Sequence, residues 1–178
     1  MDPFSSVRGL VRSLRSIDDD LGDDDVPVLA HLLQTADLLA ARHPADDELI
    51  VAGLVHDLAV ALNPGSVDHA GAGAELIAPL LGLRVATLVG GHVEAKRYLV
   101  TMDPAYAVTL SQDSTATLVL QGGPMTHAER DRFAARSDRE SLLALRRADD
   151  AAKLPGRRVA TVTSWIPLLD GVARAAKR

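Results

Sequence analysis

The segment 50–62, IVAGLVHDLAVAL, constrains the fold of this chain more than any other. Its residues are apolar on every side of a helix, which is typical of a helix buried in a core. His56 and Asp57 stand in its middle, and the segment contains no Arg or Lys that could pair with the carboxylate. Because a desolvated carboxylate is costly unless it is paired or bound to a metal, the doublet predicts one of two sites. These are a metal site and a His–Asp pair that is hydrogen-bonded within the core.

Length and composition predict a single helical domain. Hydrophobic residues make up 47% of the 178 residues and charged residues 24%, as in an ordinary soluble protein. Aromatic residues reach only 3%, so the core must consist of Leu, Val, Ala and Ile, which favours helices over strands. No strand pattern and no internal repeat is evident. We therefore predict one all-α domain, residues 1–178, folded as a compact bundle of irregularly crossing helices.

Charge and residue usage exclude several classes of protein. The net charge of −5 argues against a nucleic-acid partner, and the absence of Cys leaves only His, Asp and Glu as metal ligands. The first residues, MDPFSSVRGL, lack the core of a signal peptide, and no uninterrupted apolar run is long enough to span a membrane. We expect a cytoplasmic protein with no membrane partner.

Hydrophobic periodicity and turn signals divide the chain into helices. The expected helices are 4–17, 26–42, one that begins near residue 46 and contains 50–62, 67–81, 83–89, 92–101, 111–121, 137–153 and 159–177, with short pieces after 104 and 126. Gly90-Gly91 is expected to end one helix before His92. Capping boxes are expected at Thr126 and Ser137, and the acidic residues 18–25 should form a solvated loop.

Further residues of metal-ligand type lie in separate predicted helices. Any one of them alone is more often a core or surface residue than a ligand, but several beside the doublet favour a metal centre. The candidates are His31, His56, Asp57, His69, His92 and Asp149. The neighbouring Asp150 is an alternative to Asp149.

The order His31, His56-Asp57, Asp149 resembles the H…HD…D pattern of HD-domain metalloproteins, which are helical bundles. A second resemblance is carried by GHVEAKRYLV at 91–100, Leu110-Ser111, Ser114, Leu118 and QGGPM at 121–125. These residues are similar to those of the phosphonate-degrading mixed-valent diiron oxygenases of the PhnZ type, HD-domain oxygenases related to myo-inositol oxygenase. The match runs nearly continuously from His31 to Lys153.

This resemblance implies two iron ions in the mixed-valent Fe(II)/Fe(III) state, with O₂ as co-substrate. One iron would take His31, His56, Asp57 and Asp149. The other would take His69 and His92, with Asp57 as the bridge. Imidazole and carboxylate ligands with open positions suit iron or manganese better than a closed structural zinc site.

Substrate contacts are also implied by the resemblance. Lys96, Ser114, Thr117 and Arg146 match the positions that hold the phosphonate group in the family. Lys96 follows His92 by one helical turn, so the two share a face. Cationic and hydroxyl donors suit a tetrahedral oxyanion, although each residue alone could lie on the surface. We expect a small anionic organophosphonate or a phosphorylated small molecule as substrate.

Three departures from the family pattern affect the substrate pocket. Val60 stands where the family has a substrate-contacting His. In the family, a Tyr and a Glu can fill the iron site when it is empty, and Leu21 and Asp24 stand at those positions here. The loop between Leu62 and His69 is also shorter than in the family. The expected metal ligands are therefore intact, whereas part of the pocket and its gate has changed.

The expected function is oxidative cleavage of the C–P bond of a hydroxylated organophosphonate by a diiron oxygenase, with release of phosphate. One alternative is a metal-dependent phosphohydrolase, because the same ligands can hold metals that activate water. A second is a phosphometabolite-binding protein without turnover. Dependence on O₂ and iron separates the first function from both alternatives.

Overall fold

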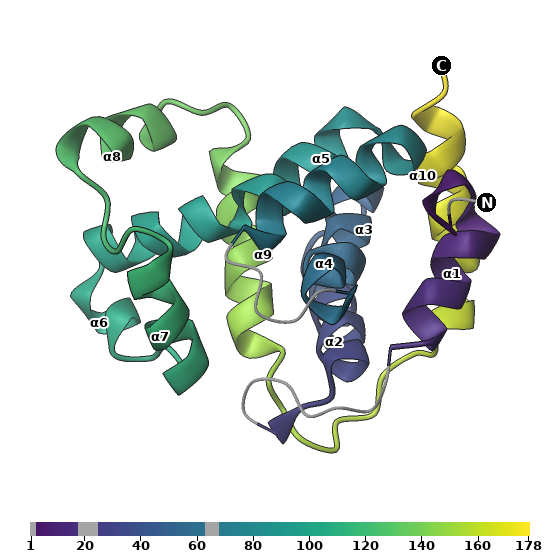
Figure 1. The fold of residues 1–178 in the computed structure, drawn as a ribbon, viewed down its shortest axis with the longest axis horizontal. Coiled ribbons are helices and arrows are strands. Elements are labelled where there is room, and N and C mark those ends of the chain that lie inside the picture. Colours follow the sequence, from purple (N-terminus) through teal and green to yellow (C-terminus); the bar gives the residue numbers. More distant parts are fainter. Residues whose placement is uncertain (1–2, 18–24, 63–67) are drawn as a thin grey trace.

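The computed structural model describes residues 3–17, 25–62 and 68–178, and the regular elements in these stretches are helices, apart from a single bridge residue at Pro27 that is drawn as a small arrow before α2 (Figure 1). The elements are η1 (Pro3–Ser5), α1 (Val7–Arg15), α2 (Val28–Arg42), α3 (Asp47–Val55), α4 (Leu58–Leu62), α5 (His69–Met102), α6 (Pro104–Ala107), α7 (Gln112–Leu120), α8 (His127–Ala134), α9 (Arg139–Ala151), η3 (Val162–Trp165) and α10 (Ile166–Ala175). The prediction of an all-α fold is confirmed.

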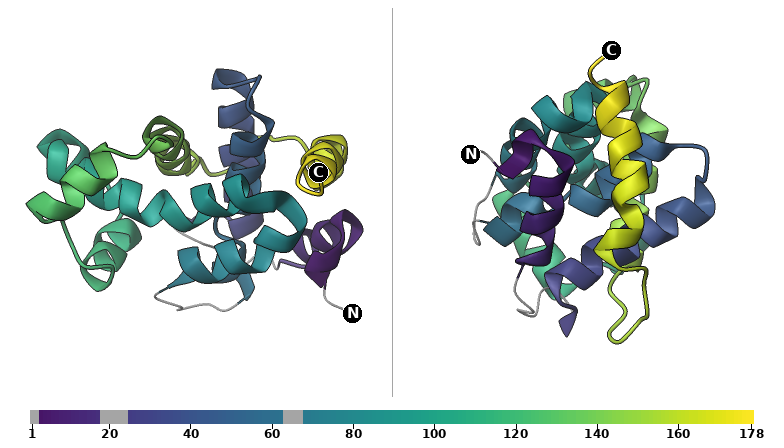
Figure 2. Two further views of the ribbon diagram at one scale, coloured as in Figure 1. Left: turned by 90° about the horizontal axis from the view of Figure 1, so that it is seen from above. Right: turned by 90° about the vertical axis from the view of Figure 1, so that its right-hand side faces the viewer.

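The core forms where α2, α3, α5 and α9 cross. α5 contacts α3, α4, α9 and α10, and α2 contacts both α3 and α9. Fully buried leucines such as Leu54, Leu58, Leu88 and Leu145 fill the space between them, as the composition predicted. α6, α7 and α8 lie together at one end of the molecule, whereas α1 and α10 lie side by side at the other (Figures 1 and 2).

The predicted continuous helix over 50–62 is wrong, because the chain leaves the helix at the His–Asp doublet. α3 ends at Val55 and α4 begins at Leu58. The Nδ1–H of His56 donates to the carbonyl oxygen of Gly53 at 2.9 Å. That carbonyl would accept the backbone N–H of Asp57 in a continuous helix. The His56 side chain thus replaces a backbone hydrogen bond, and the turn lies at the doublet.

The predicted helix end at Gly90-Gly91 is also wrong. α5 runs through both glycines and departs from helical geometry at Gly82 instead, where φ is 86° and ψ is 171°. A Cβ atom on Gly91 would lie 2.6 Å from Cδ2 of Leu142 in α9. The glycine therefore permits a close helix crossing rather than a helix end, and His92 lies within α5 instead of opening a helix.

Helix ends differ from the sequence expectations in smaller ways. The capping box of Thr126 and Glu129 is present, whereas the box expected at Ser137 is not formed among the described residues 137–140. Asp138 occupies the N-cap of α9, and its carboxylate pairs with Arg136 at 2.9 Å instead. The last expected helix, 159–177, is shortened to η3 and α10. Residues 18–24, including Leu21 and Asp24, and the loop residues 63–67 lie outside the described residues.

α5 is long and apolar enough to cross a membrane by length and composition alone. Half of its most apolar window is buried inside the protein, and its neighbours include α3 and α9. It also carries His92 and Lys96, both buried. These properties are those of the central helix of a folded bundle.

Candidate metal centre

The structure brings all six predicted ligand residues together in the core, in two adjacent groups that we call the His–Asp cluster. Within each group, one potential ligand atom per residue lies within 4.8 Å of the others. The first group consists of His31 from α2, His56 and Asp149 from α9; the second consists of Asp57, His69 at the start of α5 and His92.

Asp57 lies between the two groups and presents one oxygen to each. Its Oδ2 is 3.5 Å from Nε2 of His56 and 4.0 Å from Nε2 of His31. Its Oδ1 is 3.6 Å from Nε2 of both His69 and His92. This Oδ1 is buried, and no residue in the described part of the chain makes a hydrogen bond to it. A carboxylate in this position has the arrangement that a bridging ligand requires.

The imidazole rings have the orientation of metal ligands. The Nδ1 atoms of His31, His56 and His92 lie 3.1, 2.9 and 2.7 Å from backbone carbonyl oxygens, which can only accept. In a neutral ring Nδ1 then carries the hydrogen, and Nε2 carries a lone pair.

The Nε2 atoms also approach one another in pairs. Those of His31 and His56 lie 3.2 Å apart, as do those of His69 and His92. When the rings are neutral, two lone pairs at this distance repel, and a cation bound by both nitrogens removes the repulsion. Four imidazoles and two carboxylates without a thiolate suit iron or manganese. The residues therefore fit a pair of such metal ions.

Charges within the cluster keep the carboxylates ionised. Burial works against the charge of Asp57, yet the imidazoles of His56 and His92 hold the pKa of this carboxyl below its ordinary value. Burial lowers the pKa of His92 to about 4. It also works against a charged His56, but Asp57 and Asp149 outweigh it and raise the pKa of His56 to about 9. The negative charge of the cluster thus attracts one proton in the absence of metal, and a metal cation competes for the same place.

The geometry separates the two alternative carboxylates on α9. Oδ1 of Asp149 lies 3.3 Å from Nε2 of His31, within the cluster. The carboxylate of Asp150 instead accepts a hydrogen bond from the hydroxyl of Tyr106 at 2.6 Å and pairs with Arg146. Asp149 is therefore the candidate ligand of the two.

Lys96, Ser114 and Thr117 come together beside the cluster. The Lys96 side chain, in a residue only 3% exposed, donates to Oγ1 of Thr117 at 3.0 Å and lies 3.4 Å from the carbonyl oxygen of Ser114. Among the described residues no carboxylate lies within 4 Å of its ammonium group. Burial and the neighbouring charge of Arg146 lower the pKa of Lys96 to about 8. A buried ammonium in this situation favours a bound anion.

Lys153 is a further residue of this region that sequence reasoning missed. Its Nζ donates to Oγ of Ser111 and to Oγ of Ser114, both at 3.1 Å. Ser114 Oγ also lies 3.4 Å from Nη2 of Arg146. Lys153 follows Asp149 by four residues, a spacing that places two residues on the same face of a helix, and this spacing could have indicated its position near the cluster. Three cationic side chains therefore surround Ser114, and we call Lys96, Arg146, Lys153, Ser114 and Thr117 the anion pocket.

Arg146 has a second environment that the sequence did not indicate. It is buried, and its Nη1 donates to Oδ2 of Asp149 at 2.7 Å. Its Nε lies 3.0 Å from the hydroxyl of Tyr106, and Asp150 accepts from its other end. Arg146 thus orients the candidate ligand Asp149 from behind, and its predicted contact with substrate stays a prediction.

Comparison with known proteins places the chain among phosphonate-oxidising relatives. The model of the HD domain family matches residues 28–150. The chain is 34% identical over 167 residues to the hydroxymethylphosphonate dioxygenase of Gimesia maris, covering 88% of this chain and 83% of that protein. It is 32% identical over 158 residues to the 1-hydroxy-2-(trimethylamino)ethylphosphonate dioxygenase (glycine-betaine-forming) of Leisingera caerulea, covering 81% and 80%.

Proposed function

Because this chain belongs to the HD-domain family and to its oxygen-dependent oxygenases of the PhnZ type, we propose that it oxidatively cleaves the C–P bond of a 1-hydroxyphosphonate. The observation that carries this proposal is the buried Lys96, which lies one turn of α5 beyond His92. The cationic side chains around Ser114 would therefore adjoin the His–Asp cluster and suit a phosphonate group there. We expect the reaction to take place in the cytoplasm.

The names of the two relatives support this substrate class. Both name a phosphonate whose first carbon carries a hydroxyl group, and they differ in what else is attached to that carbon. In the proposed complex the phosphonate oxygens accept hydrogen bonds from Lys96, Lys153 and the hydroxyl of Thr117. Charge-assisted donors of this kind are the strongest available for such an anion. The hydroxyl-bearing carbon then faces the His–Asp cluster.

The proposed cofactor is a pair of iron ions. His31, His56, Asp57 and Asp149 would hold one, and Asp57, His69 and His92 the other. When bound, such a pair supplies the redox chemistry that makes O₂ reactive. The carbonyl oxygens that accept from Nδ1 of His31, His56 and His92 fix the rings with Nε2 directed inward.

The proposed reaction balances with O₂ as the only oxidant. A hydroxymethylphosphonate dianion and O₂ would give formate, hydrogenphosphate and one proton. The C–P bond breaks, one added oxygen joins the carbon and the other joins the phosphorus. The cationic side chains of the anion pocket hold a tetrahedral anion throughout, in the substrate as phosphonate and in the product as phosphate.

Oxygen uptake and phosphate release, measured together, test the proposal. The protein is loaded anaerobically with Fe(II), partly oxidised and mixed with hydroxymethylphosphonate, while EPR and Mössbauer spectroscopy report the state of the iron. We expect phosphate to appear only when O₂ is consumed, in equal amounts. Phosphate released from a phosphoester without O₂ would instead establish a hydrolase, and tight binding without product under any metal would establish a binding protein.

Lys96→Met should weaken binding of the phosphonate while leaving the metal content unchanged. Loss of one charge-assisted contact is expected to reduce affinity by about 10- to 100-fold. Because the pKa of Lys96 is lowered to about 8, the wild-type affinity should be greatest below this pH and fall as the pH rises through it. Calorimetric titration of the anaerobic protein with hydroxymethylphosphonate at several pH values measures both effects.

Arg147→Met is the matched control for Lys96→Met. Arg147 is exposed on α9 and its replacement removes the same charge outside the anion pocket. The control should retain both the affinity and its decline at high pH, whereas Lys96→Met should lose that part of the pH dependence. Equal affinities of wild type and Lys96→Met would show that Lys96 does not contact the anion.

Val60→His restores the imidazole that the family has at this position and so tests the effect of Val60 on substrate choice. Val60 is half-buried in α4, beyond the break at the doublet. Valine offers no hydrogen bond, so we expect weak turnover of a small amino-hydroxy-phosphonate by the wild type and a rise in the His variant, with iron content unchanged. O₂ uptake by the two proteins side by side decides the matter. Good wild-type turnover with no gain in the variant would contradict this role of Val60.

A further inference from the structure

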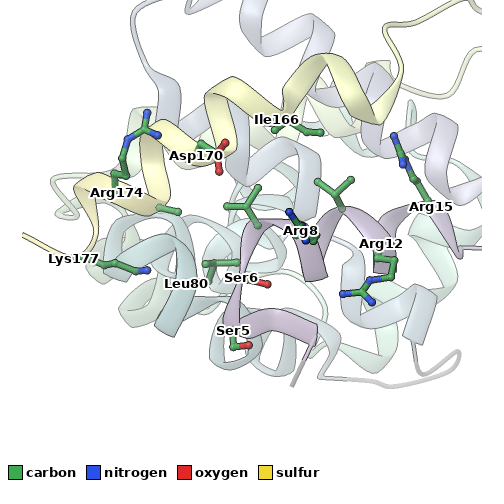
Figure 3. Close-up of a pocket in the computed structure, with 13 residues that line it drawn as sticks. Ser5, Ser6, Arg8, Arg12, Arg15, Leu80, Ile166, Asp170, Arg174 and Lys177 are labelled. Carbon is green, nitrogen blue, oxygen red and sulfur yellow. The ribbon is translucent and has the colours of Figure 1, made fainter. Parts of the chain in front are cut away.

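A second cleft lies away from the His–Asp cluster, where α1, α5 and α10 meet (Figure 3). Its volume is about 790 Å³, which is within the range of small-molecule sites of roughly 300–1,000 Å³. None of the ten residues predicted for the metal and substrate sites lines it. Since α1 and α10 lie at the end of the molecule opposite α6 and α7, this cleft is separate from the anion pocket (Figure 1).

The lining of the cleft combines an apolar floor with a cationic rim. Apolar side chains come from all three helices and include Val11, Leu80 and Ile166. The cationic lining residues are Arg8, Arg12, Arg15, Arg174 and Lys177, and the lining contains one carboxylate, that of Asp170. The chain as a whole has a net charge of −5. The positive charge is therefore a local property of this cleft.

The spacing of the cations concentrates their charge. Arg8, Arg12 and Arg15 follow one another at intervals of four and three residues along α1, so they share one face and repel one another. Arg15 donates to Oγ1 of Thr163. Within residues 3–17, 25–62 and 68–178, Arg8, Arg12 and Arg174 have no carboxylate within 4 Å of their guanidinium groups. An anion bound between α1 and α10 would relieve this repulsion.

We propose that this cleft binds a small organic phosphate, with its phosphate group on Arg8 and Arg12 of α1 and its apolar or aromatic body on the floor. The guanidinium group matches two phosphate oxygens at once, and the double negative charge of a phosphate suits a rim of several arginines better than the single charge of a carboxylate. The apolar floor favours an organic body over inorganic phosphate, because burial of that body adds to the binding free energy. The site is additional to the proposed oxygenase function and does not depend on it.

Binding of ADP to the metal-loaded full chain tests this site. Trp165 is the only Trp of the chain and directly precedes Ile166 in the lining, so its fluorescence reports binding, with calorimetry as the second measurement. We expect ADP to bind more tightly than inorganic pyrophosphate. Saturating hydroxymethylphosphonate should not displace it, and vesicles of phosphatidylcholine with phosphatidylserine should not bind.

Two double variants distinguish binding of ADP in the cleft from attraction to positive charge elsewhere on the protein. Arg8→Gln with Arg12→Gln should weaken ADP binding by about tenfold or more, through loss of two charge-assisted contacts. Arg147→Gln with Arg158→Gln removes two exposed arginines outside the cleft and should leave ADP binding unchanged. Oxygen uptake with phosphonate should be normal in both. The proposal would be overturned by no ADP binding, by vesicle binding alone, or by equal weakening of ADP binding in both variants. It would also be overturned if pyrophosphate bound as tightly as ADP, or if phosphonate displaced ADP.

Discussion

Asp57→Asn should deprive the protein of both metal ions, not of one. The carboxylate presents Oδ1 to His69 and His92 and Oδ2 to His56, so its loss removes a ligand from each group. Replacing a residue that only hydrogen-bonds to a metal ligand lowers the metal affinity by about 10- to 100-fold. Loss of a ligand shared by both metal ions should lower it further. The measurement is iron content per chain after anaerobic loading and gel filtration.

The control for this prediction is a ligand that belongs to one group alone. His92→Gln removes an imidazole from the second group and leaves His31, His56 and Asp149 in place. We expect this variant to keep about one iron per chain, because the first group retains its donors. An Asp57→Asn protein that kept two irons per chain would refute the bridging position of Asp57.

The positions of the candidate ligands were predictable to different degrees. The order of His31, the doublet and Asp149 along the chain identified the cluster, because several ligand-type residues on separate buried helices are rarely accidental. The turn that divides Asp57 between the two groups was not predictable. At the doublet the His56 side chain donates to the carbonyl oxygen of Gly53, but His92 makes the same bond to Val89 inside α5. The bond therefore accompanies the turn and does not by itself cause it, and helical periodicity reports neither.

Tertiary packing decided what periodicity could not. Gly90-Gly91 has the composition of a helix end, yet the absence of a side chain at Gly91 makes room for Leu142 of α9. The sequence favoured Asp149 over Asp150 by its spacing to Lys153 but left the choice open. The structure adds the reason, because Tyr106 of α6 donates to the carboxylate of Asp150 and so holds it outside the cluster. The same packing shows that Arg146 forms ion pairs with Asp149 and Asp150, the two carboxylates of α9.

Arg146→Met should destabilise the protein strongly, by about 3–5 kcal/mol, the usual cost of removing one partner from a buried ion pair. Arg146 is buried, pairs with Asp149 and Asp150, and offsets the cost of burying the charge of Asp149, whose pKa it holds well below the ordinary value. Methionine keeps much of the volume but leaves both carboxylates without their cation. Denaturant unfolding in the presence of EDTA measures this loss without a contribution from bound metal.

The pH dependence of that loss identifies its cause. A carboxyl group whose pKa is lowered on folding contributes stability above its ordinary pKa, and this contribution disappears as the pH falls. The wild type keeps this contribution down to about pH 4, because Arg146 holds the pKa of Asp149 well below its ordinary value. In Arg146→Met, burial without the cation favours the protonated carboxyl, so we expect the variant to gain stability relative to the wild type as the pH falls from 7 toward 4. Arg147→Met, which removes an exposed arginine next to Arg146, should have nearly wild-type stability at both pH 7 and pH 4.

Adding Asp150→Asn to Arg146→Met should recover part of the stability at pH 7, since one buried carboxylate is then absent. Wild-type stability in Arg146→Met, together with weakened phosphonate binding, would instead assign Arg146 to the substrate alone.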